Sequence, residues 1–194
     1  MDEAIAIEKA KAGDKDSFRY LVEIYEKQAF ATAFFLTHHF YTAQDVVQEA
    51  FVQCYFHLKE LREPAQFRWW FYRILTRISW QKKYQDKKIY PVAEILEDKE
   101  STWQQYLKES HLTLEKDTLL FYMEQLEEKH RTVLILYYFN GFSVKEIARI
   151  LGCMEGTIKS RLYYGRKRLR ALLSSAENTD KCNDTNTQHK EVSS

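Results

Sequence analysis

The strongest structural signal in the chain is the stretch from Ser143 to Leu173, which reads SVKEIARILGCMEGTIKSRLYYGRKRLRALL. Ser143 and Glu146 have the spacing of a capping box, in which each side chain satisfies a free backbone N–H at a helix start. Gly152 lies between two apolar-periodic segments and can supply the positive φ that a tight turn needs. The stretch therefore predicts a short helix, a tight turn and a longer second helix.

The second helix of this pair separates two kinds of side chain. At about 100° per residue, its apolar stripe consists of Ile158, Leu162, Leu169 and Leu172. Its opposite face carries Lys159, Ser160, Tyr163, Arg166, Lys167 and Arg170. A charge run alone would favour a solvated surface helix. Together with the capping box and the turn glycine, it favours a helix-turn-helix whose second helix enters the major groove of DNA.

Composition extends the helical prediction to the whole chain. Only 5 glycines and 2 prolines occur in 194 residues, and 45% of the residues are hydrophobic, which is enough for a packed core. We expect an all-α fold of two small helical domains joined by a flexible linker, with the helix-turn-helix in the C-terminal domain. The expected ranges are 1–88 for the N-terminal domain, 89–115 for the linker, 116–175 for the C-terminal domain and 176–194 for a disordered tail.

Capping signals and breakers place the N-terminal helices. The first is expected from Glu3 to Ala12, ending at Gly13, and the second from about Ser17 after the caps Asp14 and Asp16. A capping signal at Thr42 predicts a third helix to about Leu58, and a fourth should run from about Phe67 to Lys88. Within the linker, one loose helix is expected from Trp103 to Lys108.

Several classes of function are disfavoured by what the chain contains. Its formal net charge is only +1, so any contact with DNA must come from local clusters. It carries no Gly-rich phosphate loop, H-E-x-x-H pair or nucleophile elbow, so we expect no catalysis, metal or cofactor. Adjacent residues point about 100° apart on a helix, so His38 and His39 cannot easily bind one metal ion together. We therefore expect both to be surface histidines.

The chain also lacks the signals of a secreted or membrane protein. The three cysteines, Cys54, Cys153 and Cys182, lie far apart with no C-x-x-C spacing, which is typical of idle thiols in a reducing compartment. No apolar run approaches the length of a bilayer span, and the acidic start does not resemble a signal peptide. We expect a cytoplasmic protein without membrane insertion.

The segment from Phe67 to Lys87 mixes aromatic and basic residues. On a helix, one stripe is formed by Phe67, Trp70, Phe71, Ile74 and Ile78, and is expected in the core. The other side carries Trp69, Arg73, Thr76, Trp80, Lys83, Tyr84 and Lys87. The rings could stack on unpaired bases of a nucleic acid while the cations contact its phosphate backbone. Alternatively, the rings pack against a neighbouring helix, and the pattern alone does not separate the two.

The preceding helix is acidic where this one is basic. Asp45, Gln48 and Glu49 fall near one face. Such a patch would repel DNA, so it is either a solvated surface or a docking surface for a protein.

Taken in order, these segments resemble an RNA polymerase sigma factor of the extracytoplasmic-function (ECF) type. Residues 45–51 (DVVQEAF) resemble its D-x-V-Q-E-x-F helix, and residues 67–74 (FRWWFYRI) its F-x-x-W-L-Y-R-I helix. Residues 126–134 resemble the start of its C-terminal domain, and residues 152–162 its G-x-S-x-G-T-V-K-S-R-L turn and recognition helix. Two positions depart from the pattern: Arg77, where relatives often have Asn, and Met154, where they usually have a Ser N-cap.

The resemblance assigns roles by position. Recognition of the −35 element is implied for Gly156, Lys159, Ser160, Arg161, Tyr163, Tyr164, Arg166 and Lys167. Recognition and melting of the −10 element are implied for Pro64, Ala65, Gln66, Trp69, Arg73, Thr76, Arg77, Trp80 and Lys83. Docking on core polymerase is implied for Asp45, Gln48 and Glu49.

The resemblance also implies a function and partners. The chain is expected to bind core RNA polymerase through the β′ clamp helices and the β flap, and to direct initiation at promoter DNA. An anti-sigma factor is the implied regulator. The alternative from the residues alone is a stand-alone helix-turn-helix regulator, which would need neither the acidic helix nor the aromatic basic face.

Overall fold

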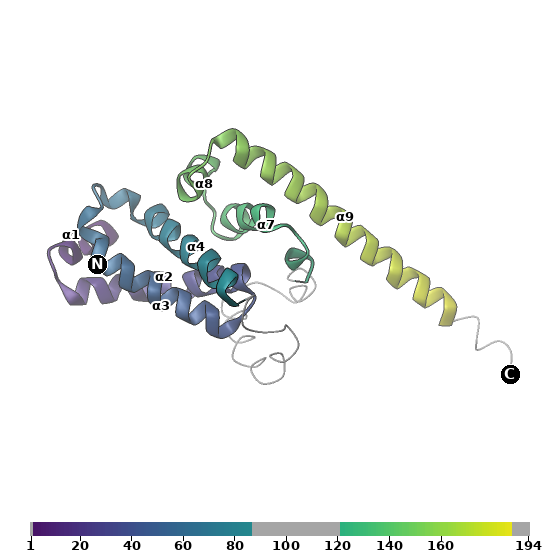
Figure 1. Cartoon of the computed structure of the whole chain (residues 1–194), viewed down its shortest axis with the longest axis horizontal. Coiled ribbons are helices and arrows are strands. Elements are labelled where there is room, and N and C mark those ends of the chain that lie inside the picture. The colour runs from purple at the N-terminus through teal and green to yellow at the C-terminus, as the bar shows by residue number, and fades with distance from the viewer. Residues whose placement is uncertain (1, 87–120, 188–194) are drawn as a thin grey trace.

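The computed structural model describes residues 2–86 and 121–187, and these residues form helices and turns without a β-strand (Figure 1). The N-terminal set comprises α1 (Glu3–Lys11), α2 (Lys15–Thr37), α3 (Phe40–His57), η1 (Leu58–Glu60), η2 (Pro64–Gln66) and α4 (Phe67–Asp86). The C-terminal set comprises α7 (Glu128–Leu134), the π-helical turn η3 (Ile135–Phe139), α8 (Val144–Leu151) and α9 (Glu155–Thr187). The predicted all-α class is confirmed. The predicted linker, with its loose helix, lies outside the described residues.

Local caps set most of the helix boundaries. Asp14 caps α2 by accepting from the backbone N–H groups of Asp16 and Ser17, and Gly13 reverses the chain before it with φ +99°. The start of α3 differs from the prediction. Its N-cap is His39, whose Nδ1 accepts from the Thr42 N–H at 3.2 Å, so Thr42 belongs to the first turn. An imidazole nitrogen replaces the expected hydroxyl cap.

The core of the N-terminal set is aromatic. Phe67, Phe71 and Tyr72 of α4 are completely buried. The Phe71 ring lies 4.8 Å from that of Phe51 on α3 and 5.7 Å from that of Tyr25 on α2. Burial of such a side chain stabilises the fold by about 1.5–3 kcal/mol. These contacts fix α4 against both α2 and α3.

The helix-turn-helix forms as its sequence predicts. Ser143 and Glu146 make both bonds of the capping box, and Gly152 ends α8 in the left-handed region with φ 64°. Ile158 and Leu162 of α9 are buried. A Cβ added at Gly165 would lie 3.3 Å from the Leu134 side chain of α7. The absence of a side chain at this position therefore lets α9 approach α7 closely.

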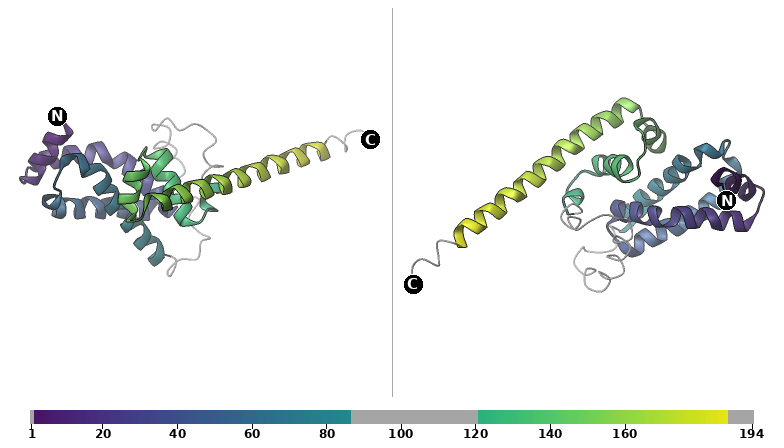
Figure 2. Two further views of the ribbon diagram at one scale, coloured as in Figure 1. Left: turned by 90° about the horizontal axis from the view of Figure 1, so that it is seen from above. Right: turned by 180° about the vertical axis from the view of Figure 1, so that it is seen from behind.

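Helix α9 is longer than expected and extends away from the other helices (Figure 2). It continues to Thr187, so the prediction of a disordered tail is wrong for residues 176–187. The chain has neither glycine nor proline after Gly165, so nothing in its sequence breaks the helical backbone.

The two sets of helices share one hydrophobic core rather than standing apart. Helix α8 packs on α4, and α7 and η3 contact α2. At this junction His38 ends α2 in the left-handed region with φ 60°, and its Nε2 is buried. His38 is half-buried with its Nε2 shielded from solvent, so the expectation that it is a surface histidine is wrong. Arg131 of α7 and Lys83 of α4 lie near it.

We predict that the fold loses stability as the pH falls because of His38. Burial lowers the pKa of its imidazole to about 3, and Arg131 and Lys83 disfavour the charged form further. The unfolded chain keeps a pKa near 6.5, so below that pH protons bind the unfolded state preferentially. Between pH 7 and pH 5 the free energy of unfolding should fall by about 2 kcal/mol from this group.

Urea unfolding at the two pH values tests this prediction. His38→Asn removes the titration and keeps a residue that tolerates positive φ. An equal loss of stability in the wild type and this variant would contradict the role of His38.

Candidate nucleic-acid interface and protein-docking groove

The outer face of α9 carries the side chains predicted to read DNA. Lys159, Ser160, Tyr163, Arg166 and Lys167 are exposed, while Ile158 and Leu162 on the other face are buried. The same solvent-facing side includes Gly156 and Tyr164, and Arg161 is half-buried at its margin. Tyr163 and Tyr164 are each 57% exposed, with their rings 5.2 Å apart. The expected separation of apolar and polar faces is therefore present.

Two neighbouring features shape this face. The Arg166 guanidinium donates to the Tyr138 hydroxyl at 3.3 Å, so a residue of η3 helps to position a predicted phosphate contact. Met154 precedes α9 and is 79% exposed. The N–H groups of Thr157 and Ile158 reach the Met154 carbonyl oxygen, but a Met side chain offers no oxygen to cap the first turn.

The exposed side of α4 is narrower than its sequence predicts. Arg73 and Arg77 are exposed, and Arg77 donates to Gln53 of α3 at 2.8 Å. Thr76 is only 1% exposed, and its hydroxyl donates to the Tyr72 carbonyl at 2.8 Å. The predicted DNA contact by Thr76 is therefore wrong. Its hydroxyl satisfies a backbone acceptor one turn earlier, as Thr often does in helices.

Trp69 and Lys83 of this face have partners within the protein, and Trp80 is partly shielded from solvent. The Trp69 ring packs against the shared core and lies 5.8 Å below the Arg149 guanidinium of α8. Trp80 is half-buried, with its Nε1 shielded from solvent. Lys83 donates to the Leu36 carbonyl at the end of α2, at 3.1 Å. Trp69 therefore packs against neighbouring parts of the protein in this arrangement, which is one of the two interpretations of this face.

The turn before α4 presents a small exposed surface. Pro64, Ala65 and Gln66 form η2, in which Ala65 is exposed and the other two are half-buried. The Gln66 amide donates to the Glu63 carboxylate at 2.7 Å. The turn therefore lies next to the start of α4, on the surface.

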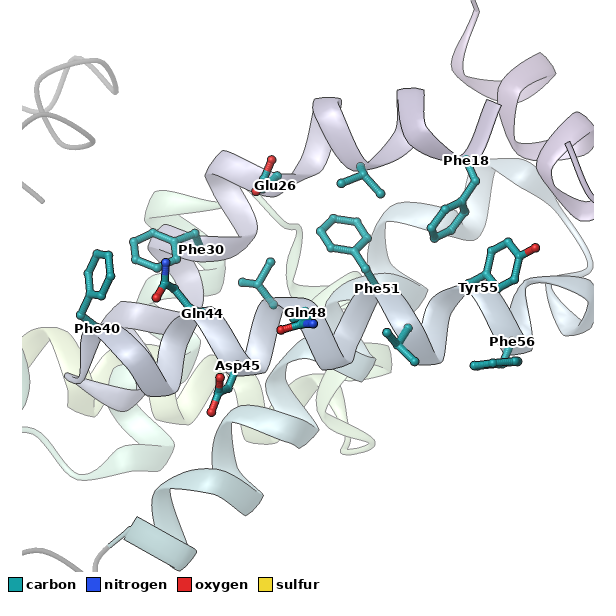
Figure 3. Close-up of a pocket in the computed structure, with 13 residues that line it drawn as sticks. Phe18, Glu26, Phe30, Phe40, Gln44, Asp45, Gln48, Phe51, Tyr55 and Phe56 are labelled. Carbon is teal, nitrogen blue, oxygen red and sulfur yellow. The ribbon is translucent and has the colours of Figure 1, made fainter. Parts of the chain in front are cut away.

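A groove of about 670 Å³ runs between α2 and α3 (Figure 3). Its walls are mainly aromatic and its margin is polar. The lining includes Phe18, Phe30, Phe40, Phe51, Tyr55 and Phe56, together with Gln44, Asp45 and Gln48. Phe56 is 73% exposed, which is unusual for a phenylalanine. An apolar channel with a carboxylate at its edge is suited to a protein helix rather than to DNA.

The structure brings together only two of the three predicted docking residues. Asp45 and Gln48 are exposed on the groove margin, whereas Glu49 pairs with Lys82 of α4 at 3.4 Å. The apolar walls of the groove were not predicted. The signal that could have found them is the run of apolar residues on the exposed side of α3, Val52, Tyr55 and Phe56.

Comparison with known families gives two matches in the order of the two helix sets. The model of sigma-70 region 2 matches residues 21–81, and that of sigma-70 region 4 matches residues 116–169. The first match covers most of α2, α3 and α4, and the second includes the helix-turn-helix.

Individual relatives match over most of their length. The chain is 30% identical over 176 residues to the RNA polymerase sigma-H factor of Pseudomonas aeruginosa, covering 83% of this chain and 88% of that protein. It is 29% identical over 176 residues to the ECF RNA polymerase sigma factor SigW of Bacillus subtilis, covering 86% and 94%.

One solved structure supports the fold. The sigma factor RpoE of Bartonella quintana, solved in complex with the anti-sigma factor NepR, superposes with a TM-score of 0.67 at 21% identity. The superposition covers 83% of the present chain and 98% of the RpoE chain. None of the helices among residues 2–86 and 121–187 is long and apolar enough to cross a membrane.

We predict that Met154→Ser stabilises the protein. A Ser hydroxyl at this position would accept a backbone N–H of the first turn of α9, which raises the free energy of unfolding by about 1 kcal/mol. Met154→Ala, which cannot cap, is the matched control. Chemical unfolding monitored by circular dichroism measures the effect, and equal stability of the Ser and Ala variants would contradict it.

Proposed function

We propose how this chain acts from one premise: it belongs to the sigma-70 family of RNA polymerase sigma factors, and within that family to the ECF type. It binds core RNA polymerase and directs promoter-specific initiation of transcription. The observation that carries the assignment of roles is the two-sided α9, which is held by Ile158 and Leu162 and directs its cations outward.

For the −35 element, we propose that α9 enters the major groove. Lys159, Ser160 and Tyr163 in its first turns would reach base edges, and Gly156 would let the backbone approach closely. The phosphate contacts would come from Arg161, Tyr164, Arg166 and Lys167, with Tyr138 holding Arg166. Each specific base contact contributes about 1–3 kcal/mol of discrimination.

For the −10 element, we propose that the turn Pro64–Gln66 and the start of α4 hold the melted strand. Arg73 and Arg77 are the exposed cations on this helix. Trp69, Trp80 and Lys83 belong to the same surface, but each has a partner within the protein or is half-buried. Their use by DNA therefore requires side chains to rearrange.

For core polymerase, we propose that the groove between α2 and α3 receives the β′ clamp helices. Apolar walls suit one face of a helix, and Asp45 and Gln48 can pair with basic or polar groups at its edge. Glu49 would contribute indirectly, because its partner is Lys82 within the protein. The helix-turn-helix set would contact the β flap.

The same family also indicates a class of regulator and a cellular location. RpoE of Bartonella quintana was solved with an anti-sigma factor, and we propose that a regulator of this class binds the present chain. The chain acts on cytoplasmic RNA polymerase, and we place it in the cytoplasm, without catalytic activity or cofactor. The ranges 1–88, 89–115 and 116–175 stay our proposed division into modules.

We predict that Lys159→Ala and Tyr163→Ala each reduce transcription from −35-dependent promoters by about 10- to 100-fold, because each removes a base contact. Their binding to core polymerase should be unchanged, since neither side chain lines the groove. Run-off transcription and co-purification with polymerase provide the two measurements.

Lys129→Ala is the matched control for these variants. It removes one cation from α7, where Lys129 pairs with Glu127 at 2.7 Å. Loss of polymerase binding in the α9 variants, or an equal defect in Lys129→Ala, would disprove the proposed division of roles.

We predict that Asp45→Arg combined with Val52→Asp prevents assembly with core polymerase, since it reverses the charge at the groove edge and places an acid among its apolar walls. Glu23→Arg, at an exposed acid of α2 outside the groove, should assemble normally. Gel filtration with core polymerase measures both. Normal assembly of the groove variant would place the docking surface elsewhere.

A further inference from the structure

A chain of polar contacts connects α3 with α4. Glu49 of α3 pairs with Lys82 of α4, with 3.4 Å between the carboxylate Oε2 and Nζ. The other carboxylate oxygen of Glu49 accepts from the Gln53 side-chain amide at 3.3 Å, and the Gln53 side-chain oxygen accepts from Arg77 Nη2 at 2.8 Å. The linked side chains are therefore, in order, Lys82, Glu49, Gln53 and Arg77.

The chemistry of these side chains fixes the direction of each hydrogen bond. An arginine side chain only donates, and a carboxylate only accepts. Gln53 lies between one of each, and its carboxamide carries both an acceptor oxygen and a donor nitrogen. A glutamate at this position would have no donor for Glu49, and a lysine would have no acceptor for Arg77. Glutamine fits this position because it can bond to both neighbours at once.

Gln53 also orients Arg77 without neutralising its charge. A carboxylate in direct contact with a guanidinium forms a charge-assisted pair, which would compete with an anionic ligand for the cation. The carboxamide of Gln53 is neutral, and it separates Arg77 from the carboxylate of Glu49. Arg77 is exposed, and Arg73 is exposed one turn earlier on α4. This edge of α4 therefore offers cations to a nucleic acid.

Glu49 and Gln53 lie outside the groove that we assign to core polymerase. Asp45 and Gln48 line that groove, but neither Glu49 nor Gln53 belongs to its lining. Both are half-buried, so packing restricts them more than a fully exposed side chain. Their contacts lead from α3 to the exposed cation of α4 rather than into the groove.

A side chain that is already oriented loses less freedom when it binds a ligand. Arginine has several rotatable bonds, and immobilising such a side chain weakens binding by roughly two- to tenfold. The bond from Arg77 to Gln53 restricts the guanidinium before DNA arrives. Part of this loss is therefore avoided when the strand binds.

We propose that Gln53 and Glu49 are positioning residues for the melted −10 strand and act through Arg77. Gln53 holds the Arg77 guanidinium in one orientation, and Glu49 holds the Gln53 carboxamide in turn. The proposal rests on the proposed function, because it takes from it the contact between Arg77 and the melted strand. It gives Glu49 a role in strand capture, which differs from the docking role that the family resemblance implies.

A double-mutant cycle between Gln53 and Arg77 tests the proposal. Holoenzyme is assembled with the wild-type chain, Gln53→Ala, Arg77→Ala or both substitutions, and fluorescence anisotropy measures its affinity for labelled single-stranded DNA. The probe spans the −10 element of a promoter that the wild-type holoenzyme transcribes in the run-off assay. Affinity for a double-stranded −35 fragment of the same promoter is measured as well, because a misfolded chain would weaken both.

Gln53→Ala should weaken binding of the single strand by about two- to tenfold and leave binding of the −35 fragment unchanged. In a chain that already carries Arg77→Ala, the same substitution should have no further effect, because no cation is left to orient. Gln28→Ala is the matched control and should bind both probes like the wild type, since Gln28 is a half-buried glutamine of α2 outside the groove.

Two results would overturn the role of Gln53. One is a wild-type strand affinity in Gln53→Ala, and the other is a double variant in which the losses of affinity from the two substitutions multiply. A wild-type strand affinity in Arg77→Ala would instead overturn the proposed use of α4, and the positioning role with it. Failure of the proposal and failure of the proposed function are thus distinguishable.

Two substitutions at Glu49 test the second step. Glu49→Gln keeps a side-chain oxygen that can accept from Gln53, so the strand affinity should stay within about twofold of the wild type. Glu49→Leu has a similar size but no oxygen, so it should reproduce the loss expected for Gln53→Ala. Equal strand affinities of the two Glu49 variants in assembled holoenzyme would show that Glu49 does not act through Gln53.

Discussion

The burial of Ile158 and Leu162 is the constraint on which the DNA-reading surface depends. A helix of mixed composition can rotate about its axis unless one side is fixed, and these two residues fix α9 against the other helices of its set. Gly165 adds a steric condition, because a Cβ at this position would lie 3.3 Å from the Leu134 side chain, which would then have to shift. The cations of α9 face outward as a consequence of contacts on its opposite side.

Features encoded within a few residues could be predicted from the sequence. The capping box of Ser143 and Glu146 and the left-handed Gly152 depend on neighbours three or four positions apart, and both occur as predicted. The division of α4 into an apolar and a polar face was less informative than these local signals. It separates two faces, but α4 is enclosed by helices on more than one side, so Thr76 is buried although it falls among polar residues.

Contacts between distant segments could not be predicted in this way. The bond from Asn140 to Thr32 joins residues 108 positions apart, and no local pattern announces it. The groove between α2 and α3 depends on the spacing of two helices, so the sequence of α3 alone predicts its polar edge but not its apolar walls. The length of α9 could not be predicted for another reason: the polar composition of residues 176–187 indicates disorder, but this segment contains neither glycine nor proline and continues the helix.

The continuity of α9 has a practical consequence for labelling and fusion. Its 33 residues at 1.5 Å per residue make a rod of roughly 50 Å, with the base-reading turns at one end and Thr187 at the other. A fluorophore or affinity tag attached after the helix would therefore stand well clear of bound DNA. The same rod would magnify any tilt of the recognition helix into a large movement of the label, which makes this end a sensitive reporter of how the helix sits in the groove.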